Sequence, residues 1–141
     1  GTIYVIDANL VAMDLATGQA RWTFRIPGAR TGLEEYTRSA PAALDGKVFV
    51  GANNGRVYGV DGTSGRAVWE FATEAPIRSS PSLAGGLLYI GSSDKHVYAL
   101  AIDTGRLVWK HPLPAPIAST PWPDGNRLFV GCDDGRVYAL H

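Results

Sequence analysis

The sequence has little of what marks a covalently stapled or strongly charged protein. Cys132 is its one cysteine among 141 residues, so neither an internal disulfide framework nor a cysteine metal cluster can form. Its 13 basic and 13 acidic residues give no formal net charge. Broad phosphate-driven binding needs a basic face, and we therefore expect no nucleic-acid partner.

Long apolar runs and catalytic signatures are missing as well. No run of about 18 apolar residues is present, so the sequence predicts no membrane-spanning helix and no membrane insertion. No charged-then-apolar leader opens the chain, and we expect a signal peptide to be absent or already removed. There is no P-loop, no H-E-x-x-H pair and no nucleophile elbow, so the sequence predicts no catalytic residue.

What the chain has in abundance is repetition. Pro41, Pro81 and Pro121 are spaced by 81 − 41 = 40 and 121 − 81 = 40 residues. The same step relates Gly51, Gly91 and Gly131, then Val57, Val97 and Val137, and also Tyr58, Tyr98 and Tyr138. A period of about 40 to 50 residues that is rich in short strands is typical of the four-stranded blades of a β-propeller.

One complete unit shows the expected strand order. Residues 39–44 are predicted as strand A, 47–51 as strand B, 56–60 as strand C and 66–71 as strand D. The segments between them contain Gly, Asn and Asp, which tolerate the backbone angles of tight turns. Four antiparallel strands joined by hairpins would make one blade.

We read the whole chain, residues 1–141, as a single all-β propeller segment, a partial ring of about three and a half blades. The first and last units are incomplete, with strands B, C and D in the first and A, B and C in the last. The predicted parts are a partial blade at 1–26, an inserted loop at 27–36, blades at 37–75 and 76–115, and a partial blade at 116–141.

A second pattern runs through the same units, with a small residue, an Asp, a Gly and a Trp at fixed spacing. In the first unit these are Ala12, Asp14, Gly18 and Trp22. The units resemble the repeat of the pyrroloquinoline-quinone-type (quinoprotein dehydrogenase-like) β-propellers, in which this pattern is the tryptophan-docking motif. The resemblance covers nearly the whole chain and implies that each Trp packs between adjacent blades. The glycines and tryptophans concerned are Gly18, Gly65, Gly105, Trp22, Trp69 and Trp109.

The resemblance is specific for the fold and less so for function, because the family includes enzymes, assembly factors and sensor domains. The third copy has Ala101 in place of Asp, and we expect Asp103 to replace part of its role. The family's quinoprotein dehydrogenases bind quinone and calcium and share an adjacent cysteine pair, which one cysteine cannot form. Asp133 and Asp134 are interpreted as turn residues rather than metal ligands. We therefore predict no cofactor and no metal.

An inserted loop is the first feature that breaks the repeat. Phe24 and Pro41 are 41 − 24 = 17 residues apart, whereas the matching pair in the next unit is 10 apart, and the extra seven fall within 28–36. In propellers the D–A and B–C loops share one face, which usually meets ligands. Glu34, Glu35 and Tyr36 are therefore candidate partner contacts, with a tolerated surface insertion as the alternative.

Two arginines at equivalent positions are the second feature. Arg38 and Arg78 precede successive prolines of strand A, the innermost strand of a blade, so we expect them to approach the central channel. Two converging guanidinium groups there would hold a carboxylate or phosphate. The alternative is that they pair with nearby acidic side chains such as Glu74.

Further strand-A residues would surround these arginines. Ser39, Ser79 and Ser119, together with Thr120, are expected to add hydroxyl groups to the channel site. Trp122 is a candidate ligand contact, since its large ring would either plug the channel or lie exposed for a ligand, and packing in the channel is the favoured interpretation.

These observations favour a non-catalytic binding, sensor or scaffold module that recognises a protein partner or a small anionic ligand on its loop face. The alternatives are a fragment of a quinoprotein dehydrogenase, with pyrroloquinoline quinone and calcium, and a propeller appendage of a larger enzyme such as a bacterial Ser/Thr kinase. The resemblance implies an extracytoplasmic location. The ring would close within a longer chain or by pairing of two copies.

Overall fold

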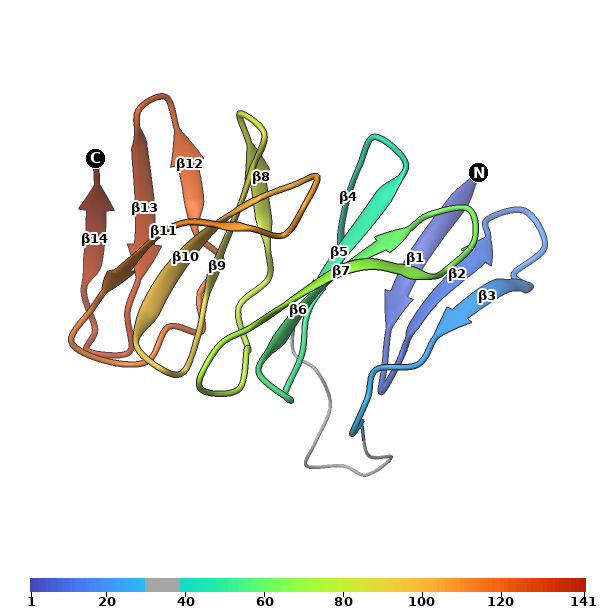
Figure 1. Ribbon diagram of the computed structural model, residues 1–141, viewed down its shortest axis with the longest axis horizontal. Helices are drawn as coiled ribbons and strands as arrows, with labels where there is room; N and C mark the ends of the chain where they lie inside the picture. The colour runs from blue at the N-terminus through green and yellow to red at the C-terminus, as the bar shows by residue number, and fades with distance from the viewer. Residues whose placement is uncertain (30–38) are drawn as a thin grey trace.

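The computed structural model describes residues 1–29 and 39–141, and every helix or strand position in these ranges is β. The strands form four antiparallel sheets, blades 1 to 4, which stand side by side along the molecule (Figure 1). Blade 1 contains β1 (Thr2–Ile6), β2 (Leu10–Asp14) and β3 (Ala20–Phe24). Blade 2 contains β4 (Ala42–Leu44), β5 (Lys47–Gly51), β6 (Arg56–Asp61) and β7 (Ala67–Ala72). Blade 3 contains β8 (Ser82–Ala84), β9 (Leu87–Gly91), β10 (His96–Ala101) and β11 (Leu107–Pro112). Blade 4 contains β12 (Trp122–Asp124), β13 (Arg127–Gly131) and β14 (Val137–Leu140).

This architecture confirms the prediction of an all-β chain built from antiparallel blades of up to four strands. Within each blade the strands are hydrogen-bonded in chain order, so the blade is a meander of hairpins. Asp45 and Gly46 join β4 to β5 with φ values of 49° and 74°, the positive values that a tight hairpin turn requires. Among the described residues no helix is long and apolar enough to cross a membrane.

Strand A is shorter than its sequence suggests. Residues 39–44 were expected to be extended and paired, but β4 begins at Ala42. The reason lies in two neighbours: Pro41 has no N–H for a ladder, and the Ser39 hydroxyl accepts the Gly51 N–H at 3.3 Å. A side chain thus replaces the backbone pairing at the start of this strand. Ser79 does the same for Gly91, at 3.2 Å.

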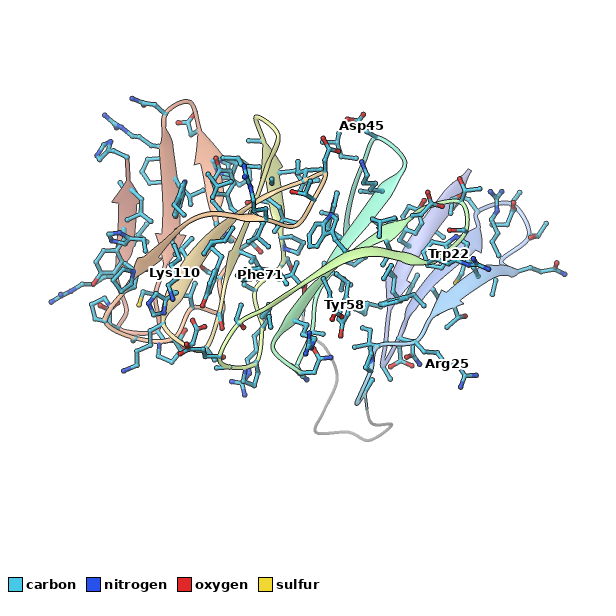
Figure 2. The ribbon with its side chains drawn as sticks, in the orientation of Figure 1. Trp22, Arg25, Asp45, Tyr58, Phe71 and Lys110 are labelled. Carbon is cyan, nitrogen blue, oxygen red and sulfur yellow. The ribbon has the colours of Figure 1, made fainter. Side chains whose placement is uncertain are left out.

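The core lies between blades rather than inside any one sheet. Val48 and Val50 of β5 pack against blade 1, whereas Phe49 between them packs against blade 3, and all three are 0 % exposed. Alternate side chains of a strand point to opposite faces, so blade 2 is buried on both. Tyr58 and Phe71, labelled in Figure 2, belong to the clusters on either side of it.

The two edges of each blade have different neighbours. The short strands A lie together, with β8 against both β4 and β12, and the Ala40 N–H donates to the Ser80 hydroxyl at 2.8 Å. The B–C hairpins and the D–A connections lie at the lower edge of the molecule in Figure 1, and the A–B and C–D turns lie toward the opposite edge. The D–A and B–C segments therefore share one face.

Candidate functional site

We call this shared face the loop face. It consists of the B–C hairpins at residues 7–9, 52–55, 92–95 and 132–135 and of the described D–A connections at 25–29, 39–41, 73–81 and 113–121. The inserted loop also belongs to the D–A class, but Glu34, Glu35, Tyr36 and Arg38 lie outside the described residues.

The B–C hairpins of blades 2, 3 and 4 each carry one polar residue that bonds a tyrosine four positions later. Tyr98 Oη donates to Asp94 Oδ2 at 2.6 Å, and Tyr138 Oη donates to Asp134 Oδ2 at 2.6 Å. In blade 2 the direction is reversed, because the Asn54 amide donates to the tyrosine oxygen of Tyr58 at 2.8 Å. The Oδ1 atom of the hairpin residue accepts the backbone N–H two positions on, in Arg56, His96 and Arg136.

The same hairpin residue also holds the D–A connection of the preceding blade. Asp94 Oδ2 accepts the Glu74 N–H at 3.1 Å. Asn54 faces the equivalent residue, Pro27, and its amide donates to the Pro27 carbonyl at 2.8 Å. Proline has no N–H, so a carboxylate could not make this contact and an amide can. In blades 2 and 3 the hairpin residue therefore matches the backbone group that the preceding blade offers.

Hydrogen bonding sets the ionisation of these residues. Burial by itself would raise the pKa of Asp94, yet the donors Tyr98 Oη, Glu74 N–H and His96 N–H together hold that pKa below its usual value. Burial raises the pKa of Tyr98, and its bond to the Asp94 carboxylate raises it further. In blade 4 the hydrogen bond from Tyr138 lowers the pKa of Asp134. Each carboxylate is thus kept charged and each phenol neutral.

Hydroxyl groups also hold the D–A connection after blade 2 in place. Ser92 is 0 % exposed, and its hydroxyl lies 3.2 Å from the Thr73 hydroxyl and 3.3 Å from the Ala75 carbonyl. Thr73 Oγ1 donates to the Gly55 carbonyl at 2.9 Å. Backbone bonds between blades add to this, since the Ser93 N–H donates to the Pro76 carbonyl at 3.0 Å. The loop face is therefore a hydrogen-bonded platform that ties blade 2 to blade 3.

Arg78 is the one member of the proposed arginine pair that the structure describes. Its side chain is exposed, and no hydrogen bond or ion pair joins it to another described residue. The alternative in which Glu74 neutralises it is therefore not seen, and the described polar contact of Glu74 is its backbone N–H to Asp94. Whether Arg38 lies beside Arg78 stays a prediction, because Arg38 is outside the described residues.

The serines expected around the arginines have structural roles instead. Ser39 and Ser79 are both 0 % exposed, and their hydroxyls accept backbone N–H groups of strand B. Ser119 Oγ donates to the Gly131 carbonyl at 2.7 Å. The expectation was therefore wrong for these three serines, whose hydroxyls bond backbone groups of strand B, whereas Thr120 is exposed and stays a prediction.

Trp122 also departs from its expected place. Packing in the channel was the favoured interpretation, but the residue is 69 % exposed. Its equivalents Ala42 and Ser82 are half-buried where strands A meet. Strands β4 and β8 each have a following strand A beside them, whereas no described strand lies beyond β12 to cover Trp122. Trp122 stays a candidate contact for a ligand or partner.

The tryptophans of strand D join consecutive blades. Trp22 Nε1 of blade 1 donates to the Gly62 carbonyl of blade 2 at 2.9 Å, and its ring lies on Gly65, where an added Cβ would come within 2.6 Å of it. Trp69 repeats the contact one blade on, donating to the Ile102 carbonyl at 2.8 Å with its ring on Gly105. The repeat pattern alone did not reveal the two acceptor carbonyls.

Trp109 is the third member of this series, and it differs from the other two. It is half-buried, and its indole N–H has no acceptor among the described residues. It lines a cavity of about 290 Å³ together with residues of blades 3 and 4, Leu140 and His141 among them.

Asp residues brace the C–D turns of blades 1 and 2, of which the turn in blade 2 receives Trp22. Asp14 accepts the N–H groups of Ala16 and Thr17, and the hydrogen bond from Arg21 holds the pKa of Asp14 far below its usual range. Asp61 braces its turn in the same way. Asp103 was expected to stand in for the missing Asp at 101, but it pairs instead with Lys47 of blade 2, at 2.7 Å. Its position two residues later in the turn directs it toward the neighbouring blade.

Comparison with known proteins agrees with this architecture. The family model described as outer membrane protein assembly factor BamB matches residues 54–141. Among solved structures, BamB from Moraxella catarrhalis superposes with a TM-score of 0.81 and 25 % identity, covering 99 % of this chain and 45 % of that chain.

Two curated proteins share part of the sequence. The dehydrogenase subunit of the alcohol dehydrogenase (quinone) of Gluconacetobacter polyoxogenes is 33 % identical over 89 residues, which cover 54 % of this chain and 12 % of that protein. The serine/threonine-protein kinase AfsK of Streptomyces griseus is 37 % identical over 76 residues, covering 53 % of this chain and 9 % of that protein. The chain thus spans about a tenth of the length of these relatives. From the match over 54–141 and the blade architecture, the chain belongs to the PQQ-like β-propeller repeat family whose model is described as outer membrane protein assembly factor BamB.

Proposed function

We propose that this chain is a non-catalytic β-propeller module, a sensor or scaffold, that binds a protein partner or a small anionic ligand on its loop face. One observation carries the proposal: the reactive groups of that face already serve the fold. The carboxylates of Asp94 and Asp134 accept hydrogen bonds from tyrosines, and the Ser92 and Thr73 hydroxyls bond within the connection between blades. Groups held in this way contribute to a rigid surface and are not positioned to act as an acid, a base or a nucleophile.

Rigidity favours recognition by such a surface. A binding site whose loops are already ordered loses less conformational entropy when a partner arrives. On this platform Arg78 is exposed and has no partner among the described residues. A guanidinium group offers a planar pair of donors that matches a carboxylate or phosphate. The proposed ligand chemistry is therefore an anionic group, such as an acidic segment of a protein.

A short polyglutamate peptide tests this proposal. We expect the wild-type chain to bind it in calorimetric titrations at low salt and Arg78→Ala to weaken the affinity by about tenfold, as for the loss of one charged hydrogen bond. Arg66→Ala is the matched control, because Arg66 is also exposed but lies in the C–D turn at the opposite edge of blade 2. Equal affinities for the wild type and both variants would overturn the assignment of Arg78.

A second candidate function is favoured by the similarity to the quinone alcohol dehydrogenase subunit. The side chains do not fit a resident metal site, since the described residues bring no three His, Cys, Asp or Glu groups together. Under this candidate the residues that hold a quinone and calcium would belong to other parts of a longer polypeptide. Titration with pyrroloquinoline quinone and calcium distinguishes the two: saturable quinone absorbance would support the dehydrogenase and contradict a purely binding role.

The kinase similarity supports a related reading in which the propeller is an appendage that senses a ligand for a larger enzyme. An extracytoplasmic location is proposed on the description of the family as an outer membrane protein assembly factor. Both readings use the same loop face, and the polyglutamate titration applies to them unchanged.

A further inference from the structure

The tip of the B–C hairpin in blade 2 carries a chemically reactive pair, Asn54 and Gly55. The backbone nitrogen of the residue after an asparagine can attack the side-chain carbon Cγ, and a glycine leaves that nitrogen unhindered because it has no Cβ. The attack closes a succinimide ring and releases the side-chain nitrogen as ammonia. Water then opens the ring to an aspartate or to an isoaspartate, whose backbone runs through the side chain. Of the asparagines in this sequence, only Asn54 precedes a glycine.

Three hydrogen bonds hold the Asn54 amide in place. Its Nδ2 donates to the Pro27 carbonyl and to the Tyr58 hydroxyl oxygen, both at 2.8 Å, and its Oδ1 accepts the Arg56 N–H at 3.0 Å. The leaving group of the reaction, Nδ2, is thus the atom that ties this hairpin to the D–A connection of blade 1. Rotation of the amide breaks these bonds, because all three depend on the orientation of its plane. The contact with Pro27 therefore opposes the reaction.

The attacking nitrogen is held as well. The Gly55 N–H donates to the Ala52 carbonyl at 3.0 Å, and Gly55 is buried. The Gly55 carbonyl accepts the backbone N–H of Thr73 at 2.7 Å and the Thr73 hydroxyl at 2.9 Å. The nitrogen must lose its proton to a base in the solvent as the new bond forms. Burial and hydrogen bonding therefore oppose the reaction from the nitrogen side, as the Pro27 contact does from the amide side.

The product cannot restore the contact between the blades. A carboxylate accepts hydrogen bonds and donates none, whereas Pro27 offers a carbonyl oxygen and has no N–H. The tyrosine side of the site can adapt, since in blade 3 the Tyr98 hydroxyl donates to the Asp94 carboxylate at 2.6 Å. An aspartate at position 54 could accept from Tyr58 in the same way, but it would turn an oxygen toward the Pro27 carbonyl. The loss is therefore specific to the contact between blades 1 and 2.

We propose that Asn54 is a deamidation site that the contact with Pro27 protects, and that the modification acts as a one-way latch on this contact. When the contact opens, the Gly55 nitrogen attacks Asn54 Cγ, ammonia leaves, and water supplies the oxygen of the new carboxylate. The resulting aspartate or isoaspartate side chain cannot donate to Pro27, so this tie between blades 1 and 2 is not re-formed. The site does not include Arg78, and it stands whether or not the loop face binds an anion.

Peptide mass spectrometry locates the conversion at Asn54. We expect it to proceed in the chain unfolded by guanidinium chloride at mildly alkaline pH. In the folded chain we expect it to be at least about tenfold slower, because only molecules with an open contact react. Tyr58→Phe removes one acceptor of the amide and leaves the reacting pair intact, so we expect faster conversion in the folded chain. Tyr98→Phe is the matched control, because it removes the equivalent hydroxyl from blade 3 and should leave the rate at Asn54 unchanged.

Two results of this experiment would overturn the proposal. One is an equal rate at Asn54 in the folded and the unfolded chain. The other is an equal rate in Tyr58→Phe and Tyr98→Phe. Comparison of the two variants separates local opening from a general loss of stability, since global unfolding would expose Asn54 in both.

The latch is tested with Asn54→Asp, which has the side chain of the product. We expect faster amide hydrogen exchange over residues 25–29, the connection that contains Pro27, than in the wild type. Asn126→Asp is the control, because Asn126 is exposed and lies in blade 4, away from this contact. Unchanged exchange over 25–29 in Asn54→Asp, or an equal change in the control, would contradict the latch.

Discussion

In blades 2 and 3 the residue at the tip of the B–C hairpin matches the backbone group that the preceding blade offers, and blade 4 departs from this match. Asp94 accepts the Glu74 N–H, and Asn54 donates to the Pro27 carbonyl. In blade 4, Asp134 stands where the equivalent of Glu74 is Pro114, which has no N–H to donate. Hydrogen-bond polarity at this one position is therefore a property of two blades together.

The first prediction concerns this polarity. Asp94→Asn places an amide among three donors, and we expect it to lower the free energy of unfolding by about 1–3 kcal/mol. Asp134→Asn is the matched control, because an amide there can donate to the Pro114 carbonyl as Asn54 does to Pro27, and we expect unchanged or higher stability. Urea denaturation of both variants measures the difference. Equal losses in the two would contradict the polarity argument.

The second prediction follows from the lowered pKa of Asp94. A carboxyl group whose pKa is lower in the folded state contributes stability above its unfolded pKa, near 3.9, and this contribution is lost as the pH falls through the folded value. We expect the wild-type chain to lose more stability between about pH 7 and about pH 3 than Asp94→Asn does. Denaturation curves at both pH values check this, and identical losses would exclude a role for Asp94 in acid sensitivity.

At the scale of strands and turns, the contact between a strand-D tryptophan and the next C–D turn is the joint between blades. Trp69 is 9 % exposed, donates to the Ile102 carbonyl, and stacks on Phe49 with ring centroids 5.8 Å apart. We expect Trp69→Ala to cost about 3–5 kcal/mol, because it leaves a cavity and an unpaired carbonyl. Trp122→Ala, at 69 % exposure, is the control and is expected to change little. Thermal unfolding compares the two variants. A midpoint for Trp69→Ala equal to that of the wild type would refute the packing of Trp69 between blades.

Substitutions at two glycines distinguish the contribution of tryptophan docking to stability from that of the turn conformation. Gly18 and Gly65 have nearly the same φ, +71° and +70°, but a Cβ would meet nothing within 4 Å at Gly18 and would meet the Trp22 ring at 2.6 Å at Gly65. Gly18→Ala is therefore expected to lower the free energy of unfolding by about 1–2 kcal/mol, from backbone strain alone. Gly65→Ala is expected to lower the free energy of unfolding clearly more, because its Cβ would also collide with the Trp22 ring. Equal unfolding free energies for the two variants would show that docking contributes nothing at this turn.

For the whole molecule, the two end blades carry faces that interior blades bury. Leu15 is 68 % and Val5 is 40 % exposed in blade 1, and Val137 is 73 % exposed in blade 4, whereas Val50 and Val57 in blade 2 are 0 % exposed. Uncovered apolar surface of this kind drives association. We expect the molar mass in light scattering to rise with concentration above the 15.0 kDa of one chain.

Substitution of the end faces tests this expectation. The double variant Leu15→Asp with Val137→Asp should stay at the mass of one chain over the same concentration range. Val68→Asp is the control, because Val68 is 51 % exposed but lies on interior blade 2. Association that survives in the double variant, or that is abolished by the control, would place the contact elsewhere.

The predictable part of the molecule is the part that repeats. Strands β5, β6 and β7 lie within one or two residues of the segments expected from alternation and turn residues, because hairpins are specified by neighbours in sequence. The exception was strand A, where the Ser39 side chain replaces the ladder. The positions of Glu34, Glu35, Tyr36 and Arg38 remain predictions outside the described residues.

The amino-acid sequence alone determined the period of 40 residues, which is read directly from residue spacings, and also the all-β class and the hairpin turns, which depend on residues a few positions apart. The tertiary structure decided which polar groups are free and which are used. Lys47 pairs with Asp103 across 56 residues, Asp94 meets Glu74 across 20, and Trp122 is left exposed. These outcomes depend on which residues the neighbouring blade places against each segment. The physical reason is that a hydrogen bond needs a matching partner and burial needs a covering surface, so both are properties of two packed segments rather than of one.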